Sequence, residues 1–397
     1  MRIKKMKLCS LLLCIVVLLS ACQEAPQEVQ ERMENYGENE QVTKRELSYC
    51  TIDELKAAKP SDINDALDNM VLPEETDFSQ IESLAVLDMS YEDKYTENRD
   101  KYSKLFHIDK STIKTNNHGA GKTRAYESDD TSGRTYFAID NSGFISYITG
   151  LTYAYINDEV QKVDTIEKYD LAKDDLPLKT VKFDKEEVAI TDVVDSAEGW
   201  LQKNMPVEQC NYRVSDVYVR DIKLGNSSYK QLSLLAQIIY QGVPMDSYGS
   251  NFMIGHGGQA ILTNTCVDIS YEGKERISDF TNCNGRIKIN AIEPLTKIVD
   301  LKSAVGLVND TLSGFNQLKI SKLFPAYALF PKYLSENMEL AMPGQKVEGR
   351  PVYAFLINMD YQGTSEFGII RAAEHFVYVD MVTGEITTDL EGNDENK

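Results

Sequence analysis

The spacing of apolar residues changes from helical to alternating near Thr123, and this change constrains the fold more than any other feature. Successive side chains of a strand point to opposite faces, so the alternation predicts strands with one buried face. In "RTYFAIDNSGFISYITG" (134–150), Phe137 and Ile139 share one face, and the four residues that end at Gly143 form a turn. Gly143 can adopt the positive φ that such a turn needs, so this segment predicts a β-hairpin.

Two later blocks of the chain have the same order of elements, a helix followed by several strands. We expect the two helices over 186–204 and 301–312. The strands of the first block are expected over 212–222, 231–240, 246–254 and 259–270, and those of the second over 318–329, 350–359, 376–382 and 385–388. Further helical stretches are expected earlier in the chain, over 52–58, 62–70 and 84–106, the last broken near Ser90. The pattern predicts an α+β fold of tandem domains, each with one helix packed on a curved antiparallel sheet.

The domain organisation follows from these blocks and from the composition of the termini. The expected parts are a signal peptide (1–21), an acidic flexible tether (22–50), an N-terminal α+β region (51–180), a first helix-on-sheet domain (181–295), a second one (296–390) and a disordered tail (391–397).

Two stretches within the blocks carry a resemblance to a known family. "IYQGVPMDSYGSNFMIGHGGQAILTNT" (239–265) and "EGRPVYAFLINM" (348–359) share a Gly-x-Pro-apolar motif, and "VDMVTGE" (379–385) follows the second. The motif residues are mostly turn formers: Gly242, Pro244, Gly349, Pro351, Asp380 and Gly384. These stretches resemble the PepSY group and the propeptides of thermolysin-type proteases, and their arrangement is similar to YycI-like extracytoplasmic regulatory proteins. The resemblance implies a cystatin-like fold with structural turns at these residues, and an inhibitory, chaperone-like or sensory role.

The first 21 residues have the composition of an export signal. Four basic residues precede an uncharged, mostly aliphatic run from Leu8 to Ala21. This run is shorter than the about 20 residues that a spanning helix needs, and it fits the apolar region of a signal peptide. Its end, "LSAC", resembles the lipobox of bacterial lipoproteins, which implies cleavage between Ala21 and Cys22 and acylation of the Cys22 thiol. A plain secretory signal with an incidental cysteine is the alternative.

The charge of the chain excludes one class of partner. The full chain has 42 Lys and Arg against 62 Asp and Glu, for a net charge of −20. Removal of the four basic residues of the signal brings this charge to −24. Such a surface is repelled by nucleic acid and by anionic lipid headgroups, so attachment to the bilayer must come from acyl chains at the N-terminus.

No motif in the chain reaches the standard of a catalytic or metal site. None of the four histidines is followed by glutamate, which excludes the His-Glu-x-x-His motif of zinc proteases. "IGHGGQ" (254–259) precedes an alternating strand, whereas a phosphate loop precedes a helix. "STIK" (111–114) lacks the companion motifs of penicillin-binding enzymes. We therefore expect no enzyme activity, no cofactor and no metal site, although a weak Ca²⁺ or glycan site stays open.

Four cysteines follow Cys22, and none has the spacing of a zinc site. If the chain reverses between residues 274 and 275, paired residues have numbers that sum to 549, and Cys266 lies opposite Cys283. Cross-strand Cβ atoms are about 4.5–5.5 Å apart, which is near the reach of a disulfide. A disulfide between Cys266 and Cys283 is one interpretation, and two unrelated thiols in an irregular loop are the other.

Together these observations predict a protein held on the cell membrane by its acylated N-terminus and facing the extracytoplasmic side. We expect it to act by binding another extracytoplasmic protein, such as a protease or a sensor ectodomain. The alternatives are a solute- or glycan-binding lipoprotein of a transport system and, less favoured by the missing motifs, an enzyme of the cell wall.

Overall fold

The computed structural model describes the body of the chain with gaps. The described residues are 46–59, 63, 70–73, 76, 78–91, 95–109, 111, 114–117, 124–127, 135–139, 145–156, 160–171, 176–184, 186–245, 253–254, 260–261, 267–282, 287–312, 318–331, 346–359, 364–365, 368–369 and 373–388. Residues Leu47–Lys397 form one compact unit. Among the described residues, no helix is both long and apolar enough to cross a bilayer.

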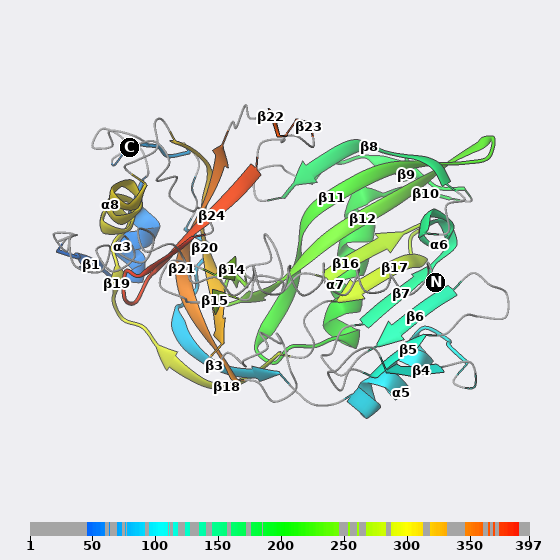
Figure 1. Ribbon diagram of the computed structural model, residues 1–397, viewed down its shortest axis with the longest axis horizontal. Coiled ribbons are helices and arrows are strands. Elements are labelled where there is room, and N and C mark those ends of the chain that lie inside the picture. The colour runs from blue at the N-terminus through cyan, green and yellow to red at the C-terminus, as the bar shows by residue number, and fades with distance from the viewer. Residues whose placement is uncertain are drawn as a thin grey trace, which may run out of the picture. The chain divides into compact units, whose positions relative to one another are not determined.

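The larger of the two main sheets is antiparallel and has the strand order β6-β7-β17-β16-β12-β11-β8, with β13 paired to β12 (Figure 1). Its strands are β6 (Thr135–Ile139), β7 (Ile145–Thr149), β8 (Val160–Asp170), β11 (Cys210–Leu224), β12 (Ser227–Tyr240), β13 (Val243–Pro244), β16 (Val267–Tyr271) and β17 (Ile277–Asn282). The sheet is built around the long β11–β12 hairpin, in which pairing runs from Cys210 and Tyr240 to Leu224 and Ser227.

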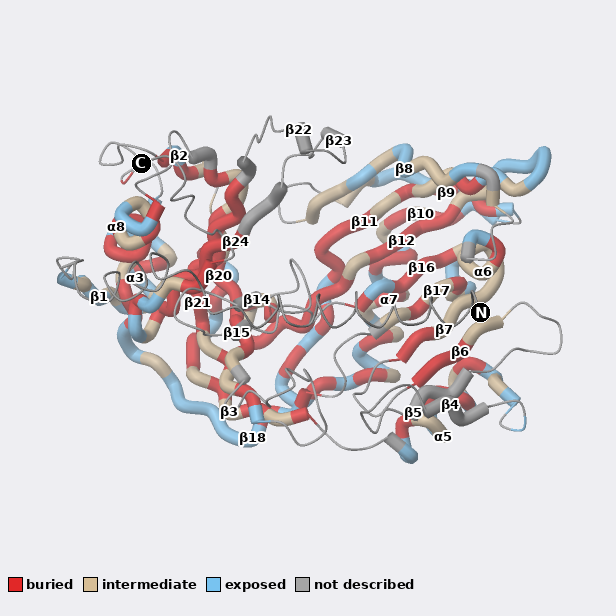
Figure 2. Tube along the Cα trace, viewed as in Figure 1, coloured by how far each residue is buried: buried red, intermediate tan, exposed pale blue. Residues whose placement is uncertain are grey.

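One face of the larger sheet is apolar and packs against helices. The helix α7 (Ile190–Asn204) buries one side, including Val193, Ala197 and Leu201. Trp200 of this helix meets Phe280 of β17 with ring centroids 5.2 Å apart. Phe106, which follows α5 (Tyr95–Leu105), stacks on Tyr147 of β7 at 4.2 Å. This face therefore forms much of the hydrophobic core, shown as buried segments of β11 and β12 in Figure 2.

The smaller sheet combines strands from both ends of the described chain. Its order is β18-β3-β21-β20-β2, with β24 paired to β21 and β25 paired to β24. The strands are β2 (Met70–Val71), β3 (Ala85–Tyr91), β18 (Ile287–Pro294), β20 (Leu318–Pro331), β21 (Lys346–Met359), β24 (Ala373–Asp380) and β25 (Ile386–Thr388). β20 pairs with nearly the full length of β21, and β3 and β24 follow one another along the opposite edge.

Helices with defined caps flank the smaller sheet. In α8 (Leu301–Thr311), the Asp300 carboxylate accepts a hydrogen bond from the Ser303 N–H. In α3 (Ile52–Ala57), Thr51 and Glu54 form a capping box. The strand β1 (Tyr49–Cys50) pairs with β19 (Ile298–Val299) just before α8, which ties the start of the body to its middle.

Shorter elements complete the described chain. They are β4 (Lys114–Asn117), β5 (Arg124–Glu127), α6 (Gly150–Ile156), β9 (Thr180–Lys182), β10 (Glu187–Ala189), β14 (Met253–Ile254), β15 (Ala260–Ile261), β22 (Thr364–Ser365) and β23 (Gly368–Ile369).

The predicted fold class was wrong. The chain is mostly β, with two large antiparallel sheets, and it is not a tandem pair of domains with one helix on a curved sheet each. Both large sheets take strands from more than one of the predicted domains: β8 lies before the boundary at 180 but pairs with β11, and β3 pairs with β18 and β21. The physical reason is that pairing between distant strands leaves no mark in the local spacing of apolar residues.

The predicted helix over 84–106 was also wrong in its first half. Residues 85–91 form β3, whose burial alternates strictly, and the helix α5 begins only at Tyr95. In contrast, the expected hairpin over 134–150 is confirmed by the pairing of β6 with β7. Of the two interpretations of the segment around 274–275, the structure shows the reversal, since Val267 pairs with Asn282 and Ser270 with Asp279.

Candidate functional site

The face of the larger sheet opposite α7 carries polar side chains on adjacent strands. We call it the polar face, and its members are Lys168, Asp170, Asp216, Tyr218, Arg220, Gln231, Ser233, Asp268, Ser270 and Asp279. Residues paired across antiparallel strands point to the same side of a sheet, so the register places these side chains together.

A β-bulge produces this face on β11. The pairing of β11 with β12 shifts between Val214 and Asp216, so that Ser215 is an extra residue in the strand. Val214 and Val217 can then both face the core, where each is almost fully buried. Asp216 is the first of the β11 residues that face the other side of the sheet, and Tyr218 and Arg220 follow it on that side.

Tyr218 contacts two cationic side chains. The Lys168 Nζ is 5.2 Å from the centroid of the Tyr218 ring, and the Arg220 Cζ is 5.9 Å from it. Burial raises the pKa of the Tyr218 hydroxyl, and the negative charge of Asp216 adds to this effect. These two cation–π contacts hold an aromatic ring with a polar tip on the polar face.

A cluster of charges at one border of the polar face joins the two sheets. Asp170 of β8 forms an ion pair with Lys322 of β20, a strand of the smaller sheet. Beside it, the buried Asp216 carboxylate accepts a hydrogen bond from the Ser215 Oγ at 2.9 Å and lies 3.9 Å from the Lys168 Nζ. Burial raises the pKa of Asp216, and the nearby Asp170 charge acts in the same direction.

Two carboxylates occupy adjoining strands at the other side of the polar face. Asp268 of β16 and Asp279 of β17 are diagonal neighbours in the register. Burial raises the pKa of Asp279 to about 6, and the charge of Asp268 contributes to the shift. Asp268 is more exposed, but its protein surroundings also displace water and raise its pKa. Asp279 therefore changes its charge in the mildly acidic range.

The centre of the polar face consists of neutral groups that bond to one another. The Gln231 Nε2 donates to the Thr152 Oγ1 at 2.8 Å and to the Ser278 Oγ at 3.1 Å. The hydroxyls of Ser233 and Ser270 are 2.9 Å apart. These contacts tie β12, β16, β17 and α6 together and make the face rigid.

This arrangement holds no recognisable catalytic machinery among the described residues. No group of three or more His, Cys, Asp or Glu side chains in the described ranges could hold a metal ion. Burial raises the pKa of the Cys50 thiol to about 11 and that of Cys210 to about 12, which makes both poor nucleophiles. Charged, aromatic and amide groups on a rigid sheet can instead provide a binding surface.

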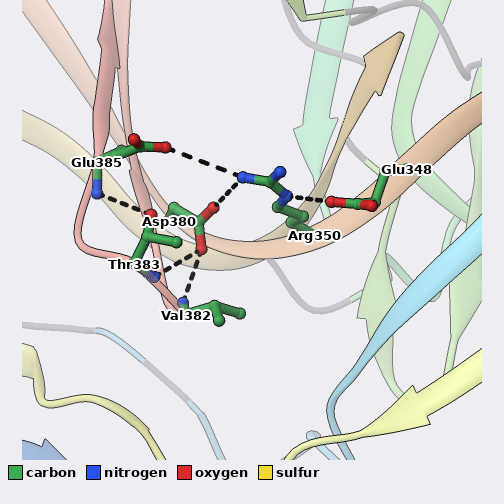
Figure 3. A network of polar contacts seen from close by, with 6 residues as sticks. All are labelled: Glu348, Arg350, Asp380, Val382, Thr383 and Glu385. Atoms are coloured by element: carbon green, nitrogen blue, oxygen red, sulfur yellow. Dashed lines mark hydrogen bonds and ion pairs between the residues drawn. The ribbon is translucent and has the colours of Figure 1, made fainter. Parts of the chain in front are cut away.

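A second polar network surrounds the turn "VDMVTGE" in the smaller sheet (Figure 3). The buried Asp380 carboxylate accepts hydrogen bonds from the N–H groups of Val382 at 2.7 Å and Thr383 at 3.2 Å. Arg350 donates from Nη1 to Asp380 at 3.0 Å and from Nε to Glu348. These bonds stay within the turn and its neighbouring strand, so the network holds β24 against β21.

The predicted turn residues divide into two groups. Gly242 and Gly384 adopt positive φ angles of 81° and 75°, as their turns require, and Asp380 closes its own turn through its carboxylate. Pro244 follows the first turn and pairs with Ile239.

Gly349 and Pro351 instead lie inside β21, so the prediction of a turn there was wrong. Pro351 is tolerated in this central strand because it stands where the partner strand changes from β3 to β24: pairing with β3 ends at Gly349, and pairing with β24 starts at Val352. A Cβ atom on Gly349 would lie 2.9 Å from the Met89 sulfur, which explains a glycine within the strand.

Five predicted site residues lie outside the described residues: Ala21, Cys22, Gly143, Cys266 and Cys283. The lipidation site, the signal cleavage site and the disulfide therefore stay predictions.

The sequence contains a signal for the polar face on β11. In "DVYVRD" (216–221), Asp216, Tyr218 and Arg220 alternate with two valines. The two valines alone predict a strand. The three polar residues that alternate with them were therefore not recognised as a group with a common face. Their shared face is the signal that could have identified them.

Comparison with known proteins adds a likeness of fold. No family model matches the chain, and no curated protein matches it. A crystal structure of an uncharacterized protein from Eubacterium rectale ATCC 33656 is similar, with a TM-score of 0.53 and 12% sequence identity. The match covers 84% of this chain and 96% of that one, so the two proteins share their fold over most of their lengths.

Proposed function

We propose that the chain is a lipid-anchored extracytoplasmic protein that acts by binding another protein through the polar face. The observation that carries this proposal is the rigid row formed by Lys168, Tyr218 and Arg220, with Asp268 and Asp279 beyond it. Tyrosine and arginine are enriched at protein interfaces, where they provide contact area and directional hydrogen bonds at the same time.

The charges of the polar face indicate the kind of partner. Asp170 is neutralised by Lys322, and Asp216 lies near Lys168. Within the described part of the chain, Asp268 and Asp279 form no ion pair, and Arg220 offsets their charge only by a longer-range attraction. The whole chain is also strongly acidic. Electrostatic complementarity therefore favours a partner with a basic surface, and the attraction would decrease with added salt.

The lipid anchor would confine this binding to the membrane surface. Cys22 ends a sequence that resembles a lipobox, and the acidic segment after it would hold the body away from the headgroups. A protein bound at the membrane meets partners in the same layer at a high effective concentration, so moderate affinity through one sheet face suffices.

Crosslinking in native membranes followed by affinity capture of the tagged chain tests the proposal. Asp268→Lys should remove a captured protein, because it places a positive charge opposite a basic partner. Glu208→Lys is the matched control, since Glu208 is exposed and does not belong to the polar face. A partner that is captured equally by both variants, or lost equally from both, would contradict binding through the polar face.

A further inference from the structure

A cavity of about 360 Å³ lies beside α6, outside the charged row of the polar face. It is lined from α6, the β11–β12 hairpin, the β16–β17 turn and the segment before β10. Its polar and aromatic lining residues include Tyr153, Asp184, Tyr229, Lys230, Glu272 and Arg276. The volume is in the lower part of the about 300–1,000 Å³ range of small-molecule pockets, so it suits a small ligand.

The cavity is built by a close approach that only glycine permits. The Glu272 side chain is 6% exposed, and its carboxylate accepts a hydrogen bond from the Leu151 N–H at 2.6 Å. Gly150 adopts a φ of 57°, and a Cβ atom there would lie 2.6 Å from the Glu272 oxygens. Glu272 is thus locked against the start of α6, and the wall that it forms exists before any ligand binds.

The formal charges of the lining cancel. Asp184 and Glu272 are acidic, and Lys230 and Arg276 are basic. Glu272 lies 3.5 Å from the Arg276 Nη2, and Lys230 lies 3.5 Å from Asp221, which is outside the lining. Such a lining offers hydrogen-bond donors and acceptors without a preference for an anion or a cation. An apolar ligand would leave these groups without water or partners, which is unfavourable.

Two tyrosines provide the remaining contact surface. Tyr153 belongs to α6 and Tyr229 to β12, and both are partly exposed. An aromatic ring packs against the C–H face of a sugar ring, while its hydroxyl and the charged side chains bond to the sugar hydroxyls.

We propose that this cavity binds a neutral polyhydroxylated ligand of the size of a mono- or disaccharide. Size, balanced charge, mixed donors and acceptors, and two tyrosines each favour this class. The inference is independent of the proposed protein binding, because none of the lining residues belongs to the polar face.

Binding is measured on the mature chain by saturation-transfer difference NMR and calorimetry. The neutral probes are glucose, maltose, cellobiose and N-acetylglucosamine, and the charged probes are glucosamine and glucuronate. We expect at least one neutral probe to bind, with a Kd that rises about tenfold in Tyr229→Ala, because the aromatic contact is lost. Tyr229→Phe should keep most of the affinity, which separates loss of the ring from loss of folding.

Tyr155→Ala is the matched control, since Tyr155 lies on α6 near the cavity, is 57% exposed and does not line the cavity. It should leave the Kd unchanged. The proposal is overturned if no neutral probe binds at millimolar concentration to protein with a native circular dichroism spectrum. It is equally overturned if a charged probe binds more tightly than all neutral ones, or if Tyr229→Ala binds like the wild type.

Discussion

Replacement of Asp279 by asparagine should stabilise the protein at neutral pH. Burial raises the pKa of this carboxyl from 3.8 to about 6, with a further contribution from the charge of Asp268. Well below the ordinary pKa, the group is protonated in both the native and the unfolded state. As the pH rises towards 6, the unfolded state loses its proton first, so the stability that depends on protonated Asp279 is lost over this window.

The size of the expected stabilisation follows from the shift in the pKa of Asp279. A pKa that increases from 3.8 to about 6 corresponds to about 3 kcal/mol in the free energy of unfolding, and this is an upper value because Asp279 keeps some exposure. Asparagine has nearly the same shape and no charge to bury. The free energy of unfolding of Asp279→Asn should therefore be about 1–3 kcal/mol higher than that of the wild type at neutral pH. The two values should be nearly equal at a pH close to the ordinary pKa of aspartate. Urea unfolding at both pH values measures the difference, and NMR titration of the wild type measures the pKa directly.

Two further variants test the cause of the shift. Asp268→Asn removes the neighbouring charge, so it should lower the pKa of Asp279 without bringing it to the ordinary value. Asp221→Asn is a control in which the pKa shift has the opposite direction, because a hydrogen bond from Ser228 lowers the pKa of Asp221. It should not stabilise the protein at neutral pH. An Asp279→Asn effect that is the same at both pH values, or an unshifted Asp279 pKa, would refute the reasoning.

Three other predictions concern the chain more widely. Cys22→Ser should abolish lipid labelling and membrane partition, and a variant that still fractionates with membranes after normal signal cleavage would contradict the lipobox interpretation. Gly242→Ala should destabilise the protein by at least about 2 kcal/mol in urea unfolding, because the residue has a positive φ and its Cβ would lie 1.8 Å from the Gln80 carbonyl oxygen. If Cys266 and Cys283 form a disulfide, mass spectrometry should find them joined in one non-reduced peptide pair; alkylation of both thiols in native protein would show that they are free.

The local spacing of apolar residues was sufficient to predict strands whose partners are close in sequence. The hairpin β6–β7 was predicted, and so were strands at the positions of β11 and β12, because alternation marks each strand and short turns connect them. The reversal that joins β16 to β17 was only one of two interpretations, since the turn between them has no strong sequence signal. The strand β3 was missed because its partners β18 and β21 lie far along the chain, and because charged residues after it favoured a helix. β8 was missed as well, since it is an edge strand with few apolar residues.

The candidate site was harder to predict than the strands. Alternation shows that Asp216, Tyr218 and Arg220 share a face, but not which strand lies beside them. Only the order of strands brings Asp279 and Lys168 onto the same face, and strand order depends on tertiary packing. The turn at Gly384 was predictable for the opposite reason, because its positive φ and the Asp380 bonds lie within one short stretch of sequence.

The shared edge of β21 has a consequence for the order in which the chain can fold. Leu87 of β3 pairs with Gly349, and Tyr49 of β1 pairs with Val299, so both early strands need partners that are synthesised much later. During synthesis their edges stay unpaired, while the larger sheet can already close around β11 and β12. A chain shortened before β21 would contain every described strand of the larger sheet but would leave one edge of β3 open, with β18 as its remaining partner among the described strands. The edge of β3, one of the first strands to be synthesised, therefore stays exposed until β21 has been synthesised and pairs with it.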